Sequence, residues 1–164
     1  MNPAVLSGET SLPITFLASF LIWLMFGGLL VLWLVDGRIK KEAALHALLA
    51  SLFAWLFTQM VKGLIPSQRP FVLGGVIPMT LTIPTDGSFP SGHSAAAFGL
   101  ATSVWLHNKK IGFAFIISSF LVALGRVIGN VHFFLDVLAG GFIGIITAYI
   151  FDRLHFYKLL SKRS

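Results

Sequence analysis

Long runs of apolar residues, separated by short polar turns, fill most of this sequence. The first run, residues 14–35, exceeds the roughly 20 residues that a helix needs to cross the hydrocarbon layer of a bilayer. Inside a bilayer no water is available to the backbone, so each spanning segment must satisfy its own N–H and C=O groups. Several such runs in one chain therefore predict a bundle of membrane-spanning helices.

The amino-acid composition also indicates a membrane protein. Of the 164 residues, 56% are hydrophobic and 11% are charged, whereas soluble domains carry about 25% charged residues. We therefore expect residues 1–164 to form a single integral membrane domain of the all-α class. Because the chain has no cysteine, disulfide bonds, thiolate catalysis and cysteine-based metal sites are excluded.

The pattern of runs and turns predicts about five membrane-spanning helices. After the first, a second span is expected over residues 43–65, where Pro66 ends the helix. The other three spans are expected at about residues 91–106, 111–128 and 131–151.

One long connection, residues 66–90, joins the second predicted span to the third. It contains five prolines and three glycines, yet residues 71–83 are largely apolar. A loop of this length is usually functional or disordered, and its apolar content argues against disorder. We expect this loop to lie at the outer membrane surface, over a site at the helix ends.

The basic residues indicate how the chain is oriented in the membrane. Five spans bring nine of the twelve Lys and Arg residues to one side, which the positive-inside rule makes cytoplasmic. The other three, Lys62, Arg69 and Arg126, fall on the outer side together with the long loop. The net charge of +6 is therefore mostly an orientation signal, and no nucleic-acid partner is expected. The nine inner residues are Arg38, Lys40, Lys41, Lys109, Lys110, Arg153, Lys158, Lys162 and Arg163.

A short polar stretch, Pro90-Ser91-Gly92-His93, opens the third predicted span. Ser91 can cap the free N–H groups of the first helical turn, and Gly92 lets the backbone approach a ligand closely. A helix N-terminus attracts anions, because its free N–H groups and its dipole both favour negative charge. The stretch therefore predicts part of a phosphate site, with His93 beside it as a proton donor.

A second group of polar residues opens the fifth predicted span. His132 and Asp136 are four residues apart and share one helical face, and Asn130 is a candidate N-cap of that helix. Charged groups near the centre of a span cost roughly 2.5–3.5 kcal/mol each, so Asp136 and Arg126 are candidates for function.

Simpler interpretations stay open for each of these residues alone. An interfacial Lys or Arg is more often a membrane anchor, a histidine at a helix start is more often a satisfied polar residue, and Asp136 could merely cap its helix. The glycine-rich stretch 140–144 predicts a helix-packing face, either within the chain or between two copies. The inner histidines His46, His107 and His155 have no partners at a suggestive spacing and receive no role.

The order and spacing of the outer residues resemble the three-part signature of the type-2 phosphatidic acid phosphatase superfamily, which includes bacterial membrane lipid phosphatases. A match in three parts, within residues 62–136, is far more specific than a lone glycine motif. The parts are Lys62 with Arg69-Pro70, then Pro90-Ser91-Gly92-His93, then Arg126 with His132 and Asp136. The chain departs from the family at Gly125, where members often carry serine. It also has five predicted spans where many relatives have six.

This resemblance implies a role for each outer residue. His132 is the nucleophile that forms a phosphohistidine, Asp136 holds its other ring nitrogen, and His93 protonates the leaving oxygen and later activates water. The phosphoryl oxygens are bound by three cations, by the hydroxyl of Ser91 and by the backbone N–H groups of Ser91 and Gly92; the cations are Lys62, Arg69 and Arg126. No cofactor and no metal are expected.

The resemblance also bears on substrate and location. Small bacterial members of this family dephosphorylate undecaprenyl diphosphate, which makes this lipid the first candidate substrate. Phosphatidylglycerol phosphate and phosphatidic acid are close competitors, and a lipid-binding or transport protein with an inactive site is the non-enzyme alternative. The expected location is the bacterial cytoplasmic membrane, with the site facing the periplasm or the cell exterior, and with membrane lipids and a second copy of the chain as partners.

Overall fold

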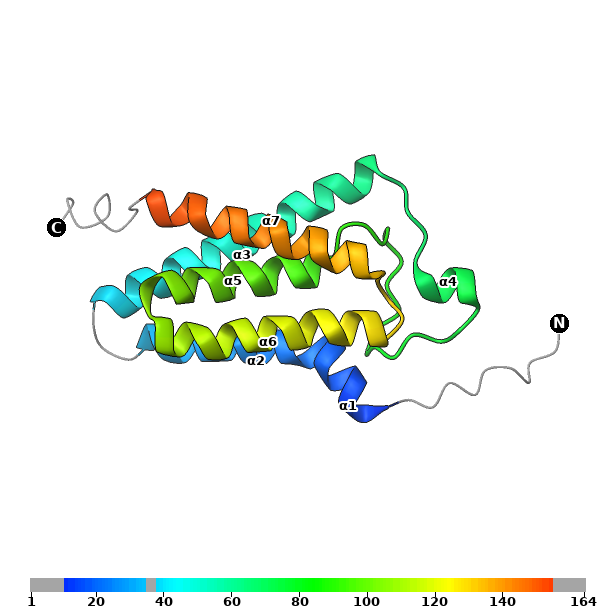
Figure 1. The fold of residues 1–164 in the computed structure, drawn as a ribbon, viewed down its shortest axis with the longest axis horizontal. Helices are drawn as coiled ribbons and strands as arrows, with labels where there is room; N and C mark the ends of the chain where they lie inside the picture. The colour runs from blue at the N-terminus through cyan, green and yellow to red at the C-terminus, as the bar shows by residue number, and fades with distance from the viewer. Residues whose placement is uncertain (1–10, 35–37, 155–164) are drawn as a thin grey trace.

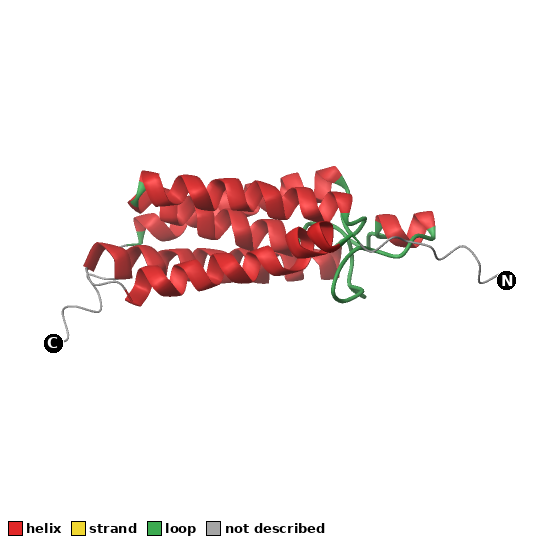
Figure 2. Ribbon diagram, turned by 90° about the horizontal axis from the view of Figure 1, so that it is seen from below, coloured by secondary structure: helices red, strands yellow, loops and turns green. Residues whose placement is uncertain are grey.

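The computed structural model describes residues 11–34 and 38–154, and their regular structure is entirely helical (Figures 1 and 2). The long helices lie side by side along one axis as an elongated bundle, with the short helix α4 beyond one end, and this confirms the predicted fold class. The elements are α1 (Leu12–Thr15), a π-helical turn (Phe16–Phe20), α2 (Leu21–Leu34), α3 (Arg38–Leu64), α4 (Pro70–Gly74), α5 (Gly92–His107), α6 (Lys109–Ile128) and α7 (Phe134–Arg153).

Four of the described helical segments are long and apolar enough to cross a membrane: Leu12–Leu34, Lys41–Leu64, Lys109–Ile128 and Phe134–Arg153. The chain is thus an integral membrane protein. The remaining predicted span is present as α5, but its 16 residues extend only about 24 Å, less than the roughly 30 Å of a hydrocarbon core.

Helix α5 forms the centre of the bundle and packs against α3, α6 and α7. Most of its residues are small, and nearly all of them are buried. Small side chains allow helix backbones to approach closely, which is the main source of packing energy between helices in lipid. On its α2, α3 and α6 sides, α5 joins a buried apolar cluster that includes Met25, Leu29, Ala47, Leu100, Val104 and Val122.

The contact between α5 and α7 depends on two glycines of α7. A Cβ atom at Gly140 would lie 2.3 Å from the carbonyl oxygen of Ser91, and one at Gly144 would lie 2.3 Å from that of Ala95. Both neighbouring atoms are backbone, so neither can swing away. Gly140 and Gly144 therefore support the interpretation in which the glycine-rich stretch packs against another helix of the same chain.

Successive long helices alternate in direction, so the connections collect at two ends (Figure 1). The start of α3, the turn between α5 and α6 and the end of α7 lie at one end, while residues 65–91 and 129–133 lie at the other. The side chains of Arg38 and Lys40 and the tail residues Lys158, Lys162 and Arg163 lie outside the described part. Lys41, Lys109, Lys110 and Arg153 mark the predicted basic end.

The long loop is tied to the helix ends by backbone hydrogen bonds. Phe71 N–H donates to the Asn130 carbonyl at 3.2 Å, and Met79 N–H donates to the Gly129 carbonyl at 3.0 Å. Farther along, Leu81 N–H donates to Ser19 Oγ at 3.1 Å. The loop is thus held over one end of the bundle, and it exposes the apolar side chains Val72, Leu73, Val76, Leu81 and Ile83.

Candidate active site

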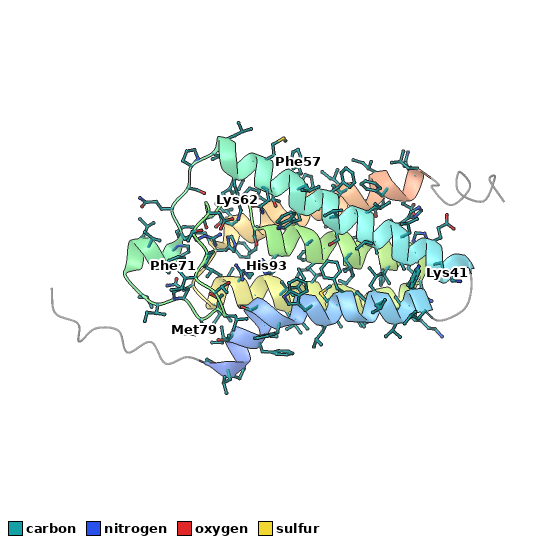
Figure 3. All side chains as sticks on the ribbon, turned by 180° about the vertical axis from the view of Figure 1, so that it is seen from behind. Lys41, Phe57, Lys62, Phe71, Met79 and His93 are labelled. Carbon is teal, nitrogen blue, oxygen red and sulfur yellow. The ribbon has the colours of Figure 1, made fainter. Side chains whose placement is uncertain are left out.

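The predicted site residues converge at the end of the bundle that carries the long loop. Figure 3 shows Lys62 and His93 close to this end, beside the loop that carries Phe71 and Met79, with Lys41 at the opposite end. Lys62 lies in the last turn of α3, His93 in the first turn of α5 and Arg126 in the last turn of α6. The alternating helix directions explain this convergence, because they bring two helix ends and one helix start to the same depth.

Arg69 links the long loop to the turn before α7. Its guanidinium donates to the carbonyls of Asp86 (2.9 Å), Gly87 (3.1 Å) and Val131 (2.8 Å), and to the carboxylate of Asp86 at 2.7 Å. Nη1 also lies 3.3 Å from Nε2 of His132. Arg69 is 3% exposed, so its charge acts in a site largely shielded from water.

His132 is buried, and its two ring nitrogens face different groups. Nε2 faces the Arg69 guanidinium. Nδ1 lies 3.5 Å from Oδ2 of Asp136 and 3.4 Å from Oγ of Ser88. This arrangement places the anionic partner behind the ring and a cation in front of it, where a phosphoryl group would bind.

Asp136 both caps α7 and supports His132. Its Oδ2 accepts hydrogen bonds from the backbone N–H of Phe133 at 2.8 Å and from the hydroxyl of Ser88 at 2.5 Å. Two expectations about this helix were wrong: it begins at Phe134 and not at residue 131, and Asn130 is not its cap. Asn130 instead adopts a left-handed conformation (φ 60°), which asparagine tolerates better than most residues, and turns the chain between α6 and α7.

The start of α5 is capped as expected, since Ser91 Oγ accepts from the backbone N–H of Ser94 at 3.4 Å. The backbone N–H of Ser91, however, donates to the carbonyl of Asp136 at 2.9 Å and so is not available to phosphate, contrary to the prediction. Gly92 is buried, and a Cβ atom there would lie 3.2 Å from side-chain atoms of Trp55, Thr58 and Gln59. Glycine at this position therefore allows close contact with α3. The N–H groups of Gly92 and His93 lie in the first turn of α5, where the helix provides no carbonyl acceptors, so they remain available as donors.

His93 lies in the first turn of α5 and is partly buried. Its ring lies near Arg126, His132, Lys62 and Arg69, among the same groups that surround His132. A histidine that is partly accessible to solvent, within a cationic site, can exchange protons with water.

Arg126 is buried, and its Nη1 donates to the carbonyl of Ala18 in the π-helical turn at 2.9 Å. Its Nε has no hydrogen-bond partner among the described residues, so a donor remains for a ligand. At the neighbouring Gly125, a Cβ atom would lie 2.7 Å from backbone atoms of Leu17 and Ala18. Of the two explanations for glycine at this position, the structure supports packing, because a serine there would push the first helix away.

Sequence reasoning missed Asp86 and Ser88. The carboxylate of Asp86 forms ion pairs with both Lys62 and Arg69, while Ser88 holds Asp136. One signal was available, because Asp86 is the only acidic residue between positions 66 and 90. Burial acts to raise the pKa of Asp86, but the hydrogen bond from Lys62 and the charges of Lys62 and Arg69 outweigh it and hold the pKa below its ordinary value.

We expect Asp86→Asn to bind orthovanadate, an analogue of phosphate, more tightly. The Asp86 carboxylate forms ion pairs with Lys62 and Arg69, the two cations that a phosphoryl group would contact. Removing its charge leaves both cations available to the ligand. The expected gain in affinity is about tenfold, the size of one charge-assisted hydrogen bond of roughly 1.5 kcal/mol. Inhibition constants of the two proteins measure it, and weaker vanadate binding by the variant would mean that Asp86 instead orients the cations.

Burial lowers the pKa of His132 to about 4, the contact with Asp136 opposes this shift, and the charges of Arg126, Arg69 and Lys62 reinforce it. We expect the ring to stay neutral from pH 8 to pH 5 in the substrate-free protein. An ordinary histidine with a pKa of 6.5 would be about 97% protonated at pH 5. Histidine-selective ¹⁵N NMR in micelles, assigned with His132→Gln, measures this directly, and a midpoint near 6.5 would contradict it.

A cavity of about 740 Å³ opens beside these residues. Its lining includes the charged residues Lys62, Arg69 and Asp86 and the apolar loop residues Phe71 and Val72. A lining of both kinds suits a ligand that has an anionic head and a hydrocarbon part.

Comparison with known proteins identifies a family and several relatives. Residues 43–160 match the PAP2 superfamily. The chain is 28% identical over 133 residues to the bacitracin transport permease protein BcrC of Bacillus licheniformis, covering 81% of this chain and 66% of that protein. It is 26% identical over 125 residues to the undecaprenyl-diphosphatase BcrC of Bacillus subtilis, covering 76% and 64%. The matched part thus spans slightly less than two thirds of these relatives' lengths.

Two solved structures share the fold. The crystal structure of Aquifex aeolicus LpxE superposes with a TM-score of 0.69 at 29% identity, over 85% of this chain and 81% of that one. A transmembrane PAP2-type phosphatidylglycerolphosphate phosphatase from Bacillus subtilis superposes with a TM-score of 0.59 at 25% identity, over 92% and 75%.

Proposed function

The chain belongs to the PAP2 superfamily, and from this membership and the geometry of its site we propose that it is a membrane lipid phosphatase acting through a phosphohistidine intermediate. One observation carries the proposal: Nε2 of the buried His132 faces the Arg69 guanidinium at 3.3 Å, with Asp136 behind the ring. A neutral imidazole aimed at a buried cation suits attack on an anionic phosphoryl group.

In the first step Nε2 of His132 attacks phosphorus, and the bond between phosphorus and the leaving oxygen breaks. His93 donates a proton to that oxygen, so the lipid product leaves with one phosphate fewer and with its leaving oxygen protonated. The Nδ1–H of His132 faces the Asp136 carboxylate, which stabilises the positive charge that forms on the ring.

In the second step water attacks the phosphohistidine. His93, now neutral, accepts a proton from this water, and the P–N bond breaks to release inorganic phosphate and restore His132. His93 is not fully buried, so the water that this step requires can reach it.

Lys62, Arg69 and Arg126 stabilise the charge that spreads over the phosphoryl oxygens, together with the Ser91 hydroxyl and the N–H of Gly92. Phosphoryl transfer depends mainly on positioning and on neutralising this charge, work that metal ions do in many enzymes. Three cations around one site supply it in this mechanism without a metal. Substrate binding displaces the Asp86 carboxylate from Lys62 and Arg69.

We propose undecaprenyl diphosphate as the substrate, with undecaprenyl phosphate as the lipid product. The name of the Bacillus subtilis relative supports this choice, and so does a cavity lined by both charged and apolar residues. Phosphatidylglycerol phosphate is the second candidate, because the Bacillus subtilis phosphatidylglycerolphosphate phosphatase shares the fold. Phosphatidic acid is the third candidate.

The test is phosphate release from these three lipids and a soluble phosphomonoester, measured in EDTA with the full chain in detergent. Release from undecaprenyl diphosphate at the highest kcat/KM is expected. A higher kcat/KM for another lipid would identify that lipid as the substrate instead. Phosphate release that depends on added metal would overturn the mechanism. If no substrate is hydrolysed while the lipids still bind, the non-enzyme alternative holds, a case that the permease name of one relative makes worth testing.

We place the protein in the bacterial cytoplasmic membrane with its site facing the periplasm or cell exterior. The basic residues Lys41, Lys109, Lys110 and Arg153 at the opposite end of the bundle support this orientation. A cysteine introduced at Leu81 should react with an impermeant reagent in intact cells, and one introduced at Lys110 should not. The reverse pattern would place the site in the cytoplasm.

A further inference from the structure

Three side chains of metal-ligating type meet at the end of the bundle opposite the active site. His46 of α3, His107 at the end of α5 and Asp152 in the last turn of α7 each offer one ligand atom, and these atoms all lie within 4.8 Å of one another. Sequence spacing showed no reason to group them, since 45 residues separate the last two. They meet because the start of α3 and the ends of α5 and α7 lie at the same end of the bundle (Figure 1).

We propose that His46, His107 and Asp152 bind a divalent transition-metal ion, with water completing the coordination. Two imidazoles and one carboxylate are a ligand set that Zn²⁺ and similar ions accept. The ion would join three helices at the end of the bundle away from the phosphoryl-transfer site, so it would hold the bundle together and take no part in catalysis.

The hydrogen bonding of His107 supports this assignment. Its Nδ1 lies 2.9 Å from the carbonyl oxygen of Ser103, and a carbonyl can only accept, so Nδ1 carries the proton. In the neutral ring Nε2 then holds the lone pair, and this is the nitrogen that faces Asp152. Metal-binding histidines are usually fixed in this way, with the other ring nitrogen donating to a carbonyl or carboxylate.

The distances also fit an ion between the side chains better than direct contact. His107 Nε2 and Asp152 Oδ1 are 4.0 Å apart, too far for a hydrogen bond. With metal–ligand bonds of about 2.0–2.1 Å, two ligands of a tetrahedral ion lie about 3.3 Å apart. Small side-chain rotations would close this gap, and the rings of His46 and His107 are already adjacent, with centroids 5.1 Å apart.

Access and burial are suitable for a bound ion. His46 is fully buried, while the side chains of His107 and Asp152 are 12% and 37% exposed. The carboxylate therefore lies at the open side, where an ion can enter, and His46 lies at the closed side.

The test is Zn²⁺ titration of the metal-stripped full chain in detergent, purified without a histidine tag. One ion per chain is expected, with a dissociation constant below about 10 µM and a rise in melting temperature. His107→Asn and Asp152→Asn, both at partly exposed positions, should weaken binding at least 10-fold and abolish the rise. Because no readout is activity, the result is independent of the proposed function.

The matched control is His93→Gln, which removes a histidine at the other end of the bundle and should bind Zn²⁺ as the wild type does. Absence of binding by the wild-type protein at 100-fold excess of Zn²⁺ over protein would overturn the proposal. Binding that persists in both His107→Asn and Asp152→Asn, or that is lost in His93→Gln, would also overturn it, and the latter result would place the ion in the active site.

Discussion

Replacing His132 by alanine is expected to reduce phosphate release to background, a loss of at least about 10⁴-fold. Removing one transition-state donor typically lowers the rate by about 10²–10³, but here the atom that forms the covalent bond is removed. The guanidinium of Arg69, which contacts Nε2, is a donor and not a nucleophile, so it cannot take the place of the imidazole.

Two measurements separate loss of the nucleophile from loss of folding. His132 is fully buried, so His132→Gln, which keeps more of the side-chain volume, is compared with the alanine variant by thermal unfolding. Rapid quenching of the wild type with ³²P-labelled lipid should trap an acid-labile phosphoprotein that both variants lack. Turnover above background in a folded His132 variant would show that another residue is the nucleophile.

Gly140→Ala is expected to lower the stability of the bundle strongly. The added methyl group would lie 2.3 Å from the Ser91 carbonyl oxygen, so α7 and α5 must separate. Overpacking of this kind costs up to about 3 kcal/mol, equivalent to a decrease of roughly 10 °C in melting temperature. Activity should fall as well, because the separation disturbs the hydrogen bond from Ser91 N–H to the Asp136 carbonyl.

Gly27→Ala is the matched control for this substitution. Gly27 is also helical, in α2, but no atom lies within 4 Å of a Cβ atom built there. The higher helix propensity of alanine should leave stability unchanged or raise it by up to about 1 kcal/mol. Equal melting temperatures for Gly140→Ala and Gly27→Ala would show that α5 and α7 are not in close contact.

The membrane class and the location of the site could be predicted because both follow from local properties. The bilayer presents the same apolar environment to every segment, so the length and hydropathy of a run decide whether it can form a spanning helix. Alternating helix directions then bring Lys62, Arg126 and His132 to one end, whatever the details of packing.

Which atoms meet within that end could not be predicted in the same way. Asp86 lies 24 residues beyond Lys62, and their ion pair depends on the path of the loop between α3 and α5. The Ser91 N–H was expected to bind phosphate, but it donates to the carbonyl of Asp136, and this bond depends on how closely α7 approaches α5. That approach is set by the small residues of two helices together.

The amino-acid sequence by itself determined a helical membrane protein with cationic and histidine side chains gathered at one face, because helix formation in lipid and the alternation of helix ends need only local information. The tertiary structure alone decided that Asp86 covers the cations, that Gly125 and Gly140 serve helix contacts, and that His46, His107 and Asp152 form a cluster at the far end. These features depend on distances between segments that are remote in the chain, and such distances arise only when the helices pack.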